Sequence, residues 1–317
     1  MRKTNKPGRD SQGRSSHSKK PAHKPTQNSS RSPERGRAQG KSVNNAAAKP
    51  AGKPERAPKQ NTPRNRIDNL SLFGMHAVRE AWLNPVRAIH ALYITQNALE
   101  EFTPHIHAAK KAGLKRPEPV IVEKSRLDGS FPEGTVHQGV AIRTELLPEY
   151  SATDLVRAGT LGLREEGKRS LILMLDQVTD PHNIGAIIRS ASAFQITGMI
   201  VQKKHTPPLQ GIVGKTACGG LDHLMIAHET NLSRTIEQLK DEGYYVIGLD
   251  ERGEESLEEF KVPDRCVFIL GAEGPGLRRL TKDSCDQMIK LPTGGAVGSL
   301  NVSNAAAICL YGLTTAK

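Results

Sequence analysis

The sequence predicts an α/β protein built around a parallel sheet, and three observations lead to this fold class. From residue 170 onward, apolar runs alternate with helical or glycine-rich segments, which is typical of a parallel sheet flanked by helices. A shorter alternation over residues 67–144 predicts a small α/β domain. Residues 1–66 show no such pattern. We therefore expect a tail at 1–66, a small domain at 67–144, a linker at 145–169 and a larger domain at 170–317.

The tail carries the positive charge of the chain. Residues 1–66 contain 18 Lys and Arg against 3 Asp and Glu, a balance of +15, whereas the other 251 residues contain 27 against 30, a balance of −3. The tail has no Leu, Ile, Phe, Tyr or Trp, so we expect it to be disordered. A basic, disordered arm indicates nonspecific binding to nucleic-acid phosphates. The alternatives are a solubilising extension and a mitochondrial transit peptide, and the latter is disfavoured because no apolar face is present.

Several classes of protein are disfavoured by composition. No apolar run has the length of a membrane span or a secretory signal, so we expect a cytoplasmic protein with no membrane partner. No Cys/His pair has zinc spacing, and we expect no metal. The cysteines are isolated within apolar segments and are expected to be core residues in a reducing compartment; they are Cys218, Cys266, Cys285 and Cys309.

Six short elements are predicted in the small domain. Strands are expected at 70–73, 89–94, 120–122 and 136–143, and helices at 75–83 and 99–111. In the linker, Pro148 and three glycines interrupt any long period. We expect no more than one helical turn there, at residues 152–158.

Six apolar runs predict the strands of the larger domain. The first, SLILMLDQV at 170–178, is nearly continuous, as expected for a strand covered on both faces. The others are GMIVQ, LMIAH, YYVIGL, RCVFIL and QMIKL. Ligands of such sheets bind beyond the carboxyl ends of the strands, so the functional residues are expected there.

A helix is predicted directly after the first of these strands. Asp180 followed by Pro181 is typical of a helix N-terminus. The apolar stripe at helical spacing consists of Ile184, Ile187, Ile188, Ala191 and Phe194. Arg189 lies off this stripe and is free to face a site, although a lone Arg on a helix is more often a solvated surface residue. Asn183 is either a site residue or only a turn residue.

A glycine-rich loop is predicted after the strand RCVFIL. Gly271, Gly274 and Gly276 form G-x-x-G-x-G, which is neither the dinucleotide nor the P-loop pattern. Glycines let a ligand approach the backbone, and Glu273 would project into that space. A tight strand-to-helix turn is the alternative interpretation.

A second glycine-containing element, Gly214-Lys215-Thr216, is a false P-loop signal. The pattern requires a glycine five positions before Gly214, and this position is Leu209. Gly211 is too close to form the same anion-binding loop. Nucleoside triphosphate binding is therefore disfavoured.

The segment at 291–312, LPTGGAVGSLNVSNAAAICLYG, has more polar residues than a helix start requires. One Ser or Asn would cap the apolar helix that follows. Here the glycines lead instead into Ser299, Asn301, Ser303 and Asn304. The excess predicts a functional loop.

The three segments together resemble the motifs of the SpoU/TrmH family, in the SPOUT superfamily. They are D-x-x-x-D-P-x-N-x-G-A-x-x-R-S-A at 176–191, I-L-G-A-E-G-x-G at 269–276, and L-P-x-x-G-x-V-x-S-L-N-V-S-x-A-x-A-I-x-L-Y at 291–311. LFGMHAVREAW and VHQGVA, within 71–143, resemble the small RNA-binding domain of members that methylate guanosine in large-subunit ribosomal RNA. The resemblance implies an S-adenosylmethionine-dependent RNA ribose 2′-O-methyltransferase with a C-terminal trefoil knot, acting as a homodimer.

The resemblance also implies a set of site residues. The methyl-donor site would be lined by Gly271, Leu291 and Leu300. The catalytic centre would consist of Asn183, Arg189, Glu273, Ser299 and Asn301. Because a guanidinium stays protonated, Arg189 is expected to stabilise the developing alkoxide and to grip a phosphate, with Glu273 orienting it.

The substrate is expected to be a guanosine of large-subunit (23S) ribosomal RNA. The alternatives are a transfer-RNA 2′-O-methyltransferase and an inactive RNA-binding ribosome-assembly protein. A Rossmann dehydrogenase is disfavoured because G-x-G-x-x-G is missing. Two positions depart from the family pattern: Asp222 stands where glutamate is frequent, and no glutamate follows Tyr311.

Overall fold

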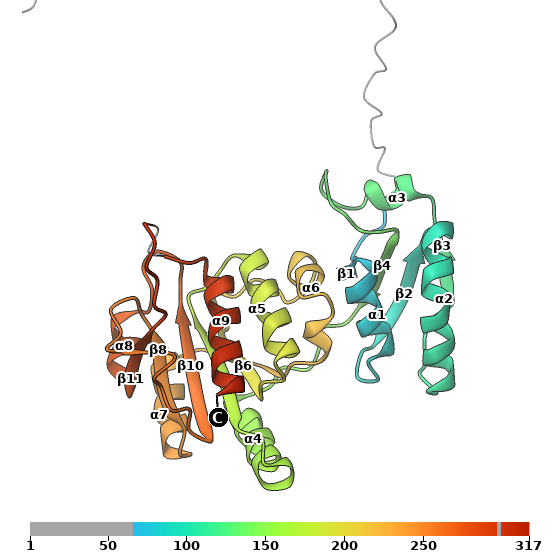
Figure 1. Cartoon of the computed structure of the whole chain (residues 1–317). Coiled ribbons are helices and arrows are strands. Elements are labelled where there is room, and N and C mark those ends of the chain that lie inside the picture. The colour runs from blue at the N-terminus through green and yellow to red at the C-terminus, as the bar shows by residue number, and fades with distance from the viewer. Residues whose placement is uncertain (1–65, 297–298, 317) are drawn as a thin grey trace, which may run out of the picture. The chain divides into compact units, whose positions relative to one another are not determined.

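The computed structural model describes residues 66–296 and 299–316 of the chain. These residues form two sheets with their helices (Figure 1). The expectations of a disordered, phosphate-binding tail fall almost wholly on residues 1–65, which lie outside the described part.

The small domain contains a four-stranded sheet. Its strands, in spatial order, are β1 (Leu72–Phe73), β4 (Val140–Thr144), β2 (Ile89–Ile94) and β3 (Pro119–Ile121). The β2–β3 pair is parallel and the other two pairs are antiparallel. Its helices are α1 (Met75–Leu83), α2 (Gln96–Lys111) and α3 (Lys124–Asp128). Trp82 of α1 meets Phe102 of α2 edge to face, at 5.8 Å, inside the core that both helices form with the sheet.

The last strand of the small domain begins at residue 140, not at 136 as predicted. Gln138 and Gly139 have φ of 56° and 76°, so the backbone turns before the strand starts. The turn has a separate function, because Gln138 Oε1 accepts a hydrogen bond from the N–H of Met75 at 3.1 Å and so caps α1.

The larger domain contains the predicted parallel sheet. Its strands, in spatial order, are β7 (Ile226–Glu229), β6 (Gly198–Gln202), β5 (Ser170–Asp176), β10 (Arg265–Gly271), β8 (Tyr245–Leu249), β11 (Gln287–Lys290) and β9 (Glu255–Ser256). Neighbouring strands are parallel throughout. Each of the six predicted apolar runs forms one of these strands, which confirms the fold class.

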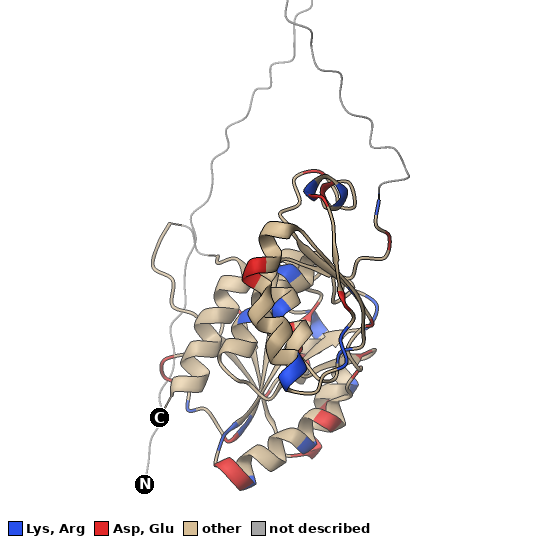
Figure 2. Cartoon of the chain, turned by 90° about the vertical axis from the view of Figure 1, so that its right-hand side faces the viewer, with Lys and Arg blue, Asp and Glu red and all other residues tan. Residues whose placement is uncertain are grey.

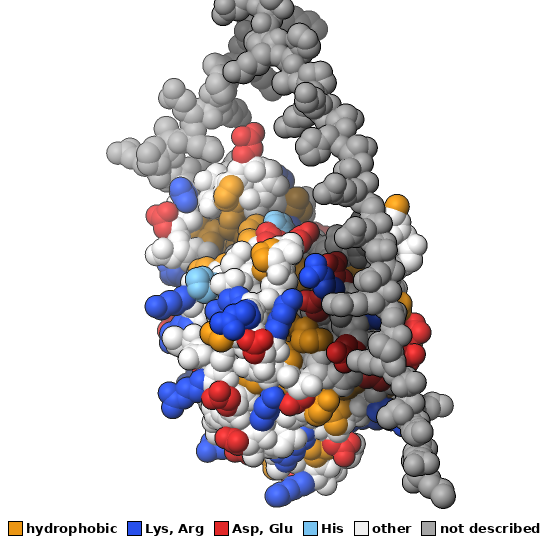
Figure 3. Space-filling view, turned by 90° about the vertical axis from the view of Figure 1, so that its left-hand side faces the viewer, with side chains coloured by type: hydrophobic (Ala, Val, Ile, Leu, Met, Phe, Trp, Pro, Cys, Tyr) orange, Lys and Arg blue, Asp and Glu red, His pale blue; other side chains and the backbone are white. Residues whose placement is uncertain are grey.

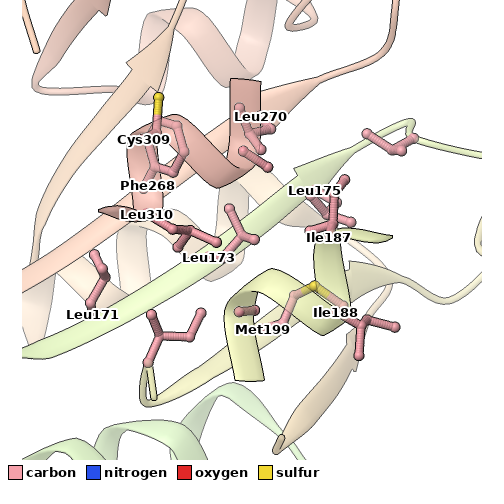
Figure 4. Close-up of a cluster of buried hydrophobic side chains, with 14 of the residues drawn as sticks. Leu171, Leu173, Leu175, Ile187, Ile188, Met199, Phe268, Leu270, Cys309 and Leu310 are labelled. Atoms are coloured by element: carbon pink, nitrogen blue, oxygen red, sulfur yellow. The ribbon is translucent and has the colours of Figure 1, made fainter. Parts of the chain in front are cut away.

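Helices pack on both faces of this sheet. One face carries α5 (Pro181–Ala193), α6 (Ile212–Thr216) and α9 (Val302–Thr315), with the 3₁₀ helix η2 (Gly220–Asp222). The other carries α4 (Ala152–Glu166), α7 (Leu232–Asp241) and α8 (Arg279–Ser284). Leu171, Leu173 and Leu175 of β5 enter the core under α5 and α9 (Figure 4), whereas Ile172 and Met174 enter the opposite core. This two-sided burial is why β5 reads as a continuous apolar run.

The expectation of a single helical turn between the two sheets was wrong. Helix α4 has 15 residues and begins with a capping box, in which Ser151 and Asp154 bond each other's backbone N–H. The helix continues through Gly159. This glycine allows close packing of the helix on β5, because a Cβ at this position would lie 1.9 Å from Ser170 Oγ. Gly167, with φ of 64°, ends the helix.

Charge in the described residues is mixed. Basic and acidic positions are interspersed along the ribbon in Figure 2, and the face drawn in Figure 3 shows the same mixture. This agrees with the balance of −3 outside the tail. Among the described residues, no helix has the length and apolar character needed to cross a membrane.

Candidate methyl-donor and ribose site

A cavity of about 480 Å³ lies at the carboxyl edge of the larger sheet, where the strand-end rule predicts a ligand. Its walls come from the ends of β8 and β10 and from the loop before α9. Five predicted site residues line it: Gly271, Glu273, Leu291, Ser299 and Leu300. The structure therefore brings the second and third motifs together around one space.

The loop after β10 folds back tightly on its own strand. Ala272 and Gly276 form an antiparallel bridge, and a Cβ on Gly271 would lie 2.2 Å from the carbonyl carbon of Gly276. Gly274 and Gly276 have φ of 86° and 68°, which side chains disfavour. Glu273 is exposed on this loop. Backbone shape alone thus requires the glycines, and the loop presents its backbone to the cavity.

A buried carboxylate joins the first motif to this loop. Asp176, the last residue of β5, has a fully buried side chain. It accepts hydrogen bonds from the backbone N–H of Arg278 at 3.1 Å and from its Nε at 2.7 Å. Both ends of the glycine loop are therefore fixed, one by β10 and the other by β5.

Two asparagines connect the first motif to the third. Asn301 caps α9: its Oδ1 accepts from the Ser303 N–H at 2.9 Å and from Ser303 Oγ at 2.6 Å. This fixes the amide so that its Nδ2 donates to Asn183 Oδ1 at 3.0 Å. Asn183 Nδ2 then has no partner among the described residues. It can donate to an oxygen of a bound substrate.

Arg189 stands apart from the cavity. It is exposed on α5, does not line the cavity, and makes no hydrogen bond or ion pair with any other described residue. Glu273 and Arg189 form no ion pair with each other, so the expected orientation of Arg189 by Glu273 is not observed in this single chain. The guanidinium is left available for an anionic ligand such as a phosphate.

Sequence reasoning missed the charged groups at the end of β8. Asp250, Glu251 and Arg252 line the cavity, as does Lys282 of α8, which pairs with Asp250. Burial raises the pKa of Asp250, but hydrogen bonds from Lys282 and from the Arg252 N–H outweigh burial and hold this pKa below its usual value. The strand-end rule, applied to YYVIGLDER, would have found them.

The cavity suits a nucleoside that carries both a positive and a negative charge. Leucine side chains from four loops and strands provide apolar walls; they are Leu249, Leu270, Leu291 and Leu300. Carboxylates and cations lie beside the exposed backbone of the glycine loop. These features match the adenine, ribose, ammonium and carboxylate of S-adenosylmethionine.

The described residues hold no group of three or more His, Cys, Asp or Glu arranged for a metal ion. The four cysteines are free. Burial raises the pKa of Cys266, Cys285 and Cys309 to about 12, so their thiols stay protonated and unreactive.

Two family models match the chain in the order of its two sheets. Residues 71–150 match the model described as RNA 2′-O ribose methyltransferase substrate binding, and residues 170–311 match the SpoU rRNA Methylase family. The chain belongs to the SpoU rRNA methylase family. As the family and the donor cavity indicate, it is an S-adenosylmethionine-dependent RNA methyltransferase.

Similar proteins match about three quarters of this chain over nearly all of their own length. The chain is 36% identical over 242 residues to 23S rRNA (guanosine-2′-O-)-methyltransferase RlmB of Salmonella typhi, covering 76% of this chain and 96% of that protein. It is 33% identical over 241 residues to the protein of the same name from Escherichia coli K12, with the same coverage. The SpoU methyltransferase AviRb from Streptomyces viridochromogenes, solved with AdoMet, has the same fold, with a TM-score of 0.62 at 20% identity over 78% of this chain and 91% of that one.

Proposed function

We propose that this enzyme methylates the 2′-hydroxyl of a guanosine in 23S ribosomal RNA. One observation carries the proposal: the chain matches a relative named for this reaction over 96% of that relative's length. The parts of the chain that match the two family models are the small domain and the larger one. Ribosomal RNA is favoured over transfer RNA because the relative that matches over 96% of its length is named for 23S rRNA, and this match includes the part of the chain that fits the substrate-binding model.

The donor is held by the cavity at the carboxyl edge. Gly271, Leu291 and Leu300 line this cavity and would hold the adenosine, largely through backbone groups and apolar side chains. When bound, S-adenosylmethionine supplies an electrophilic methyl group on a sulfonium. Ser299 and Glu273 also line this cavity, and the proposal places the ribose beside them.

The ribose is held by the Asn183–Asn301 pair. The free Nδ2 of Asn183 donates to the ribose, and Asn301 is kept in orientation by Ser303. Arg189 binds the neighbouring phosphate and stabilises negative charge developing on the 2′-oxygen as the hydroxyl loses its proton. A ribose hydroxyl is a weak nucleophile at neutral pH, so alignment and charge stabilisation are the contributions the site must make.

A homodimer is part of the proposal. Ile308 and Tyr311 lie three positions apart on α9 and are 46% and 61% exposed, so they form an apolar surface that a partner can cover. A second copy covering this face would bring further groups beside Arg189. The trefoil knot at the C-terminal segment, the binding of RNA phosphates by the basic tail and a cytoplasmic location complete the proposal. Sedimentation at micromolar concentration tests the dimer, and an active monomer would contradict it.

Mapping of 2′-O-methyl groups in total RNA tests the substrate. Cells with and without the gene are compared, and one 23S guanosine is expected to lose its methyl group. Purified enzyme should restore it on unmodified 23S RNA. Loss confined to a transfer-RNA position would overturn the ribosomal assignment, and binding of RNA without methyl transfer would indicate an assembly protein.

A further inference from the structure

The segment of residues 211–222, here called the coupling segment, lies between the small domain and helix α5. It contains α6 and η2 and includes the Gly214-Lys215-Thr216 sequence rejected as a P-loop. Its first residue already contacts the small domain, because the Gly211 N–H donates to Ser71 O at 2.7 Å.

Glycines make the coupling segment fit closely on both sides. Toward the small domain, a Cβ on Gly214 would lie 2.2 Å from Leu72 Cδ2. Toward α5, a Cβ on Gly185 would lie 2.6 Å from Thr216 Cβ, and one on Gly220 would lie 3.3 Å from the Cα of Arg189. The segment is thus packed against the backbone of α5 at Arg189 on one side and against the small domain on the other.

A buried ion pair also joins the coupling segment to the small domain. The side chains of Arg87, in the small domain, and Asp222, at the end of the coupling segment, are 2% and 1% exposed. Arg87 Nε lies 2.8 Å from Asp222 Oδ1 and its Nη2 lies 3.3 Å from Oδ2. Asn84 Nδ2 adds a hydrogen bond to Oδ1 at 2.9 Å. Side chains of two distant segments therefore meet with defined geometry.

The small-domain side of this pair is itself held rigidly. Arg116 donates to the backbone oxygens of Trp82, Asn84 and Arg87, at 2.6, 2.6 and 3.1 Å. Arg87 Nη1 also donates to Glu145 O at 3.1 Å. These hydrogen bonds anchor the loop that carries Arg87, so the small-domain side of the ion pair is fixed.

We propose that Asp222 is a positioning residue, which holds the substrate-binding domain in a fixed orientation on the segment that packs against Arg189. The inference rests on the proposed function, since it assumes that RNA bound by the small domain presents its ribose to Arg189 and the donor cavity. The stability of the fold does not explain such a pair, because the cost of desolvating two buried charges can exceed the free energy gained from their attraction. The orientation of the small domain relative to the catalytic residues does require such a pair, since displacement of a reacting group by about 1 Å costs up to about a hundredfold in rate.

The test compares Asp222→Asn with the wild type in single-turnover methylation of 23S RNA, with RNA and donor both saturating. We expect the rate to fall roughly tenfold to a hundredfold. Donor affinity measured by titration calorimetry should stay within about twofold, because no residue of the donor cavity is changed. Arg87→Met should give the same loss, and the double variant R87M/D222N should lose no more than either single one, as expected for two residues that act as a unit.

Glu80→Gln is the matched control. Glu80 pairs with His223 at 2.8 Å in the same contact, but the histidine is 58% exposed, so removal of this pair should leave the rate unchanged. A wild-type rate for Asp222→Asn at saturation, or a parallel loss of donor affinity, would overturn the proposal. If Asp222→Asn does not fold, the double variant R87L/D222L, which removes both charges, replaces it in the same measurements. A lower rate with unchanged donor affinity would support the proposal, and a wild-type rate or a loss of donor affinity would overturn it. A wild-type enzyme that modifies another RNA would count against the proposed function only, since the rate comparison then uses that RNA.

Discussion

The two halves of the site are built in different ways. The donor half consists of a glycine loop and apolar walls, and its shape comes from backbone that folds within 2.2 Å of where a Gly271 side chain would begin. The proposed ribose half consists of side chains on α5 and at the start of α9, linked through Asn183 and Asn301 at 3.0 Å. The first half should tolerate the removal of side-chain atoms but not their addition. The second should be sensitive to removal.

Arg189→Ala should have the largest effect on the ribose half. Removal of one preorganised charge that stabilises the transition state costs about 3–4 kcal/mol, or at least about a hundredfold in rate. Donor affinity should be nearly unchanged, because Arg189 does not line the cavity. Single-turnover rates and calorimetry measure the two separately. Near-normal turnover would remove Arg189 from the mechanism.

Gly271→Ala should break the donor half. Three backbone atoms lie within 2.5 Å of the added carbon, so the loop must move, at a cost of about 1–3 kcal/mol. We expect donor affinity to fall by roughly tenfold to a hundredfold, measured by calorimetry. Gly294→Ala is the control, since none of the described residues lies within 4 Å of its added carbon. Equal donor affinity in both variants would contradict the backbone-built donor half.

Asn301 offers a way to separate capping from ribose positioning. Asn301→Asp keeps an acceptor for the Ser303 N–H at a helix N-terminus but loses the donor to Asn183, so the rate should fall about tenfold while the melting temperature holds. Asn301→Ala loses the cap as well and should cost a further ~1 kcal/mol of stability. Thermal unfolding and kinetics distinguish these outcomes. A full rate for Asn301→Asp would exclude the asparagine pair from catalysis.

Deletion of residues 1–65 should affect neither half. The melting temperature and donor affinity should be unchanged, because this sequence has no large aliphatic or aromatic residue to add to a core. RNA binding should weaken, and on single-stranded RNA the log–log salt slope should fall by about 0.7 for each phosphate that the tail no longer neutralises. Filter binding across a salt series measures this. An unchanged slope would show that the tail does not grip RNA.

Short sequence patterns predicted most of the strands and the start and buried face of α5. The Asp180 cap is confirmed, with its carboxylate accepting the Asn183 N–H at 2.8 Å, and the α5 stripe from Ile184 to Ala191 is buried. The strands were found because burial on both faces leaves apolar runs. Helix α4 was missed because Gly159, which serves close packing, has the usual character of a helix breaker.

Contacts between distant segments were not predictable in the same way. In the sequence, Asp222 stands out only as a departure from a family pattern, whereas its partner Arg87 lies 135 positions away. No periodicity connects these two residues. The distance of Arg189 from the donor cavity was missed for the same reason, because motif order does not specify how loops fold around a cavity.

The hydrogen bond between Asn183 and Asn301 spans 118 positions of the chain. During synthesis, Asn183 therefore leaves the ribosome well before its partner exists, and the nascent enzyme has no assembled ribose half until α9 docks. If the proposed role of this pair is right, activity reports late folding, because a local opening that releases α9 should abolish catalysis. A ribosomal-RNA-modifying enzyme made in this way becomes competent only after nearly all of its catalytic domain has been translated.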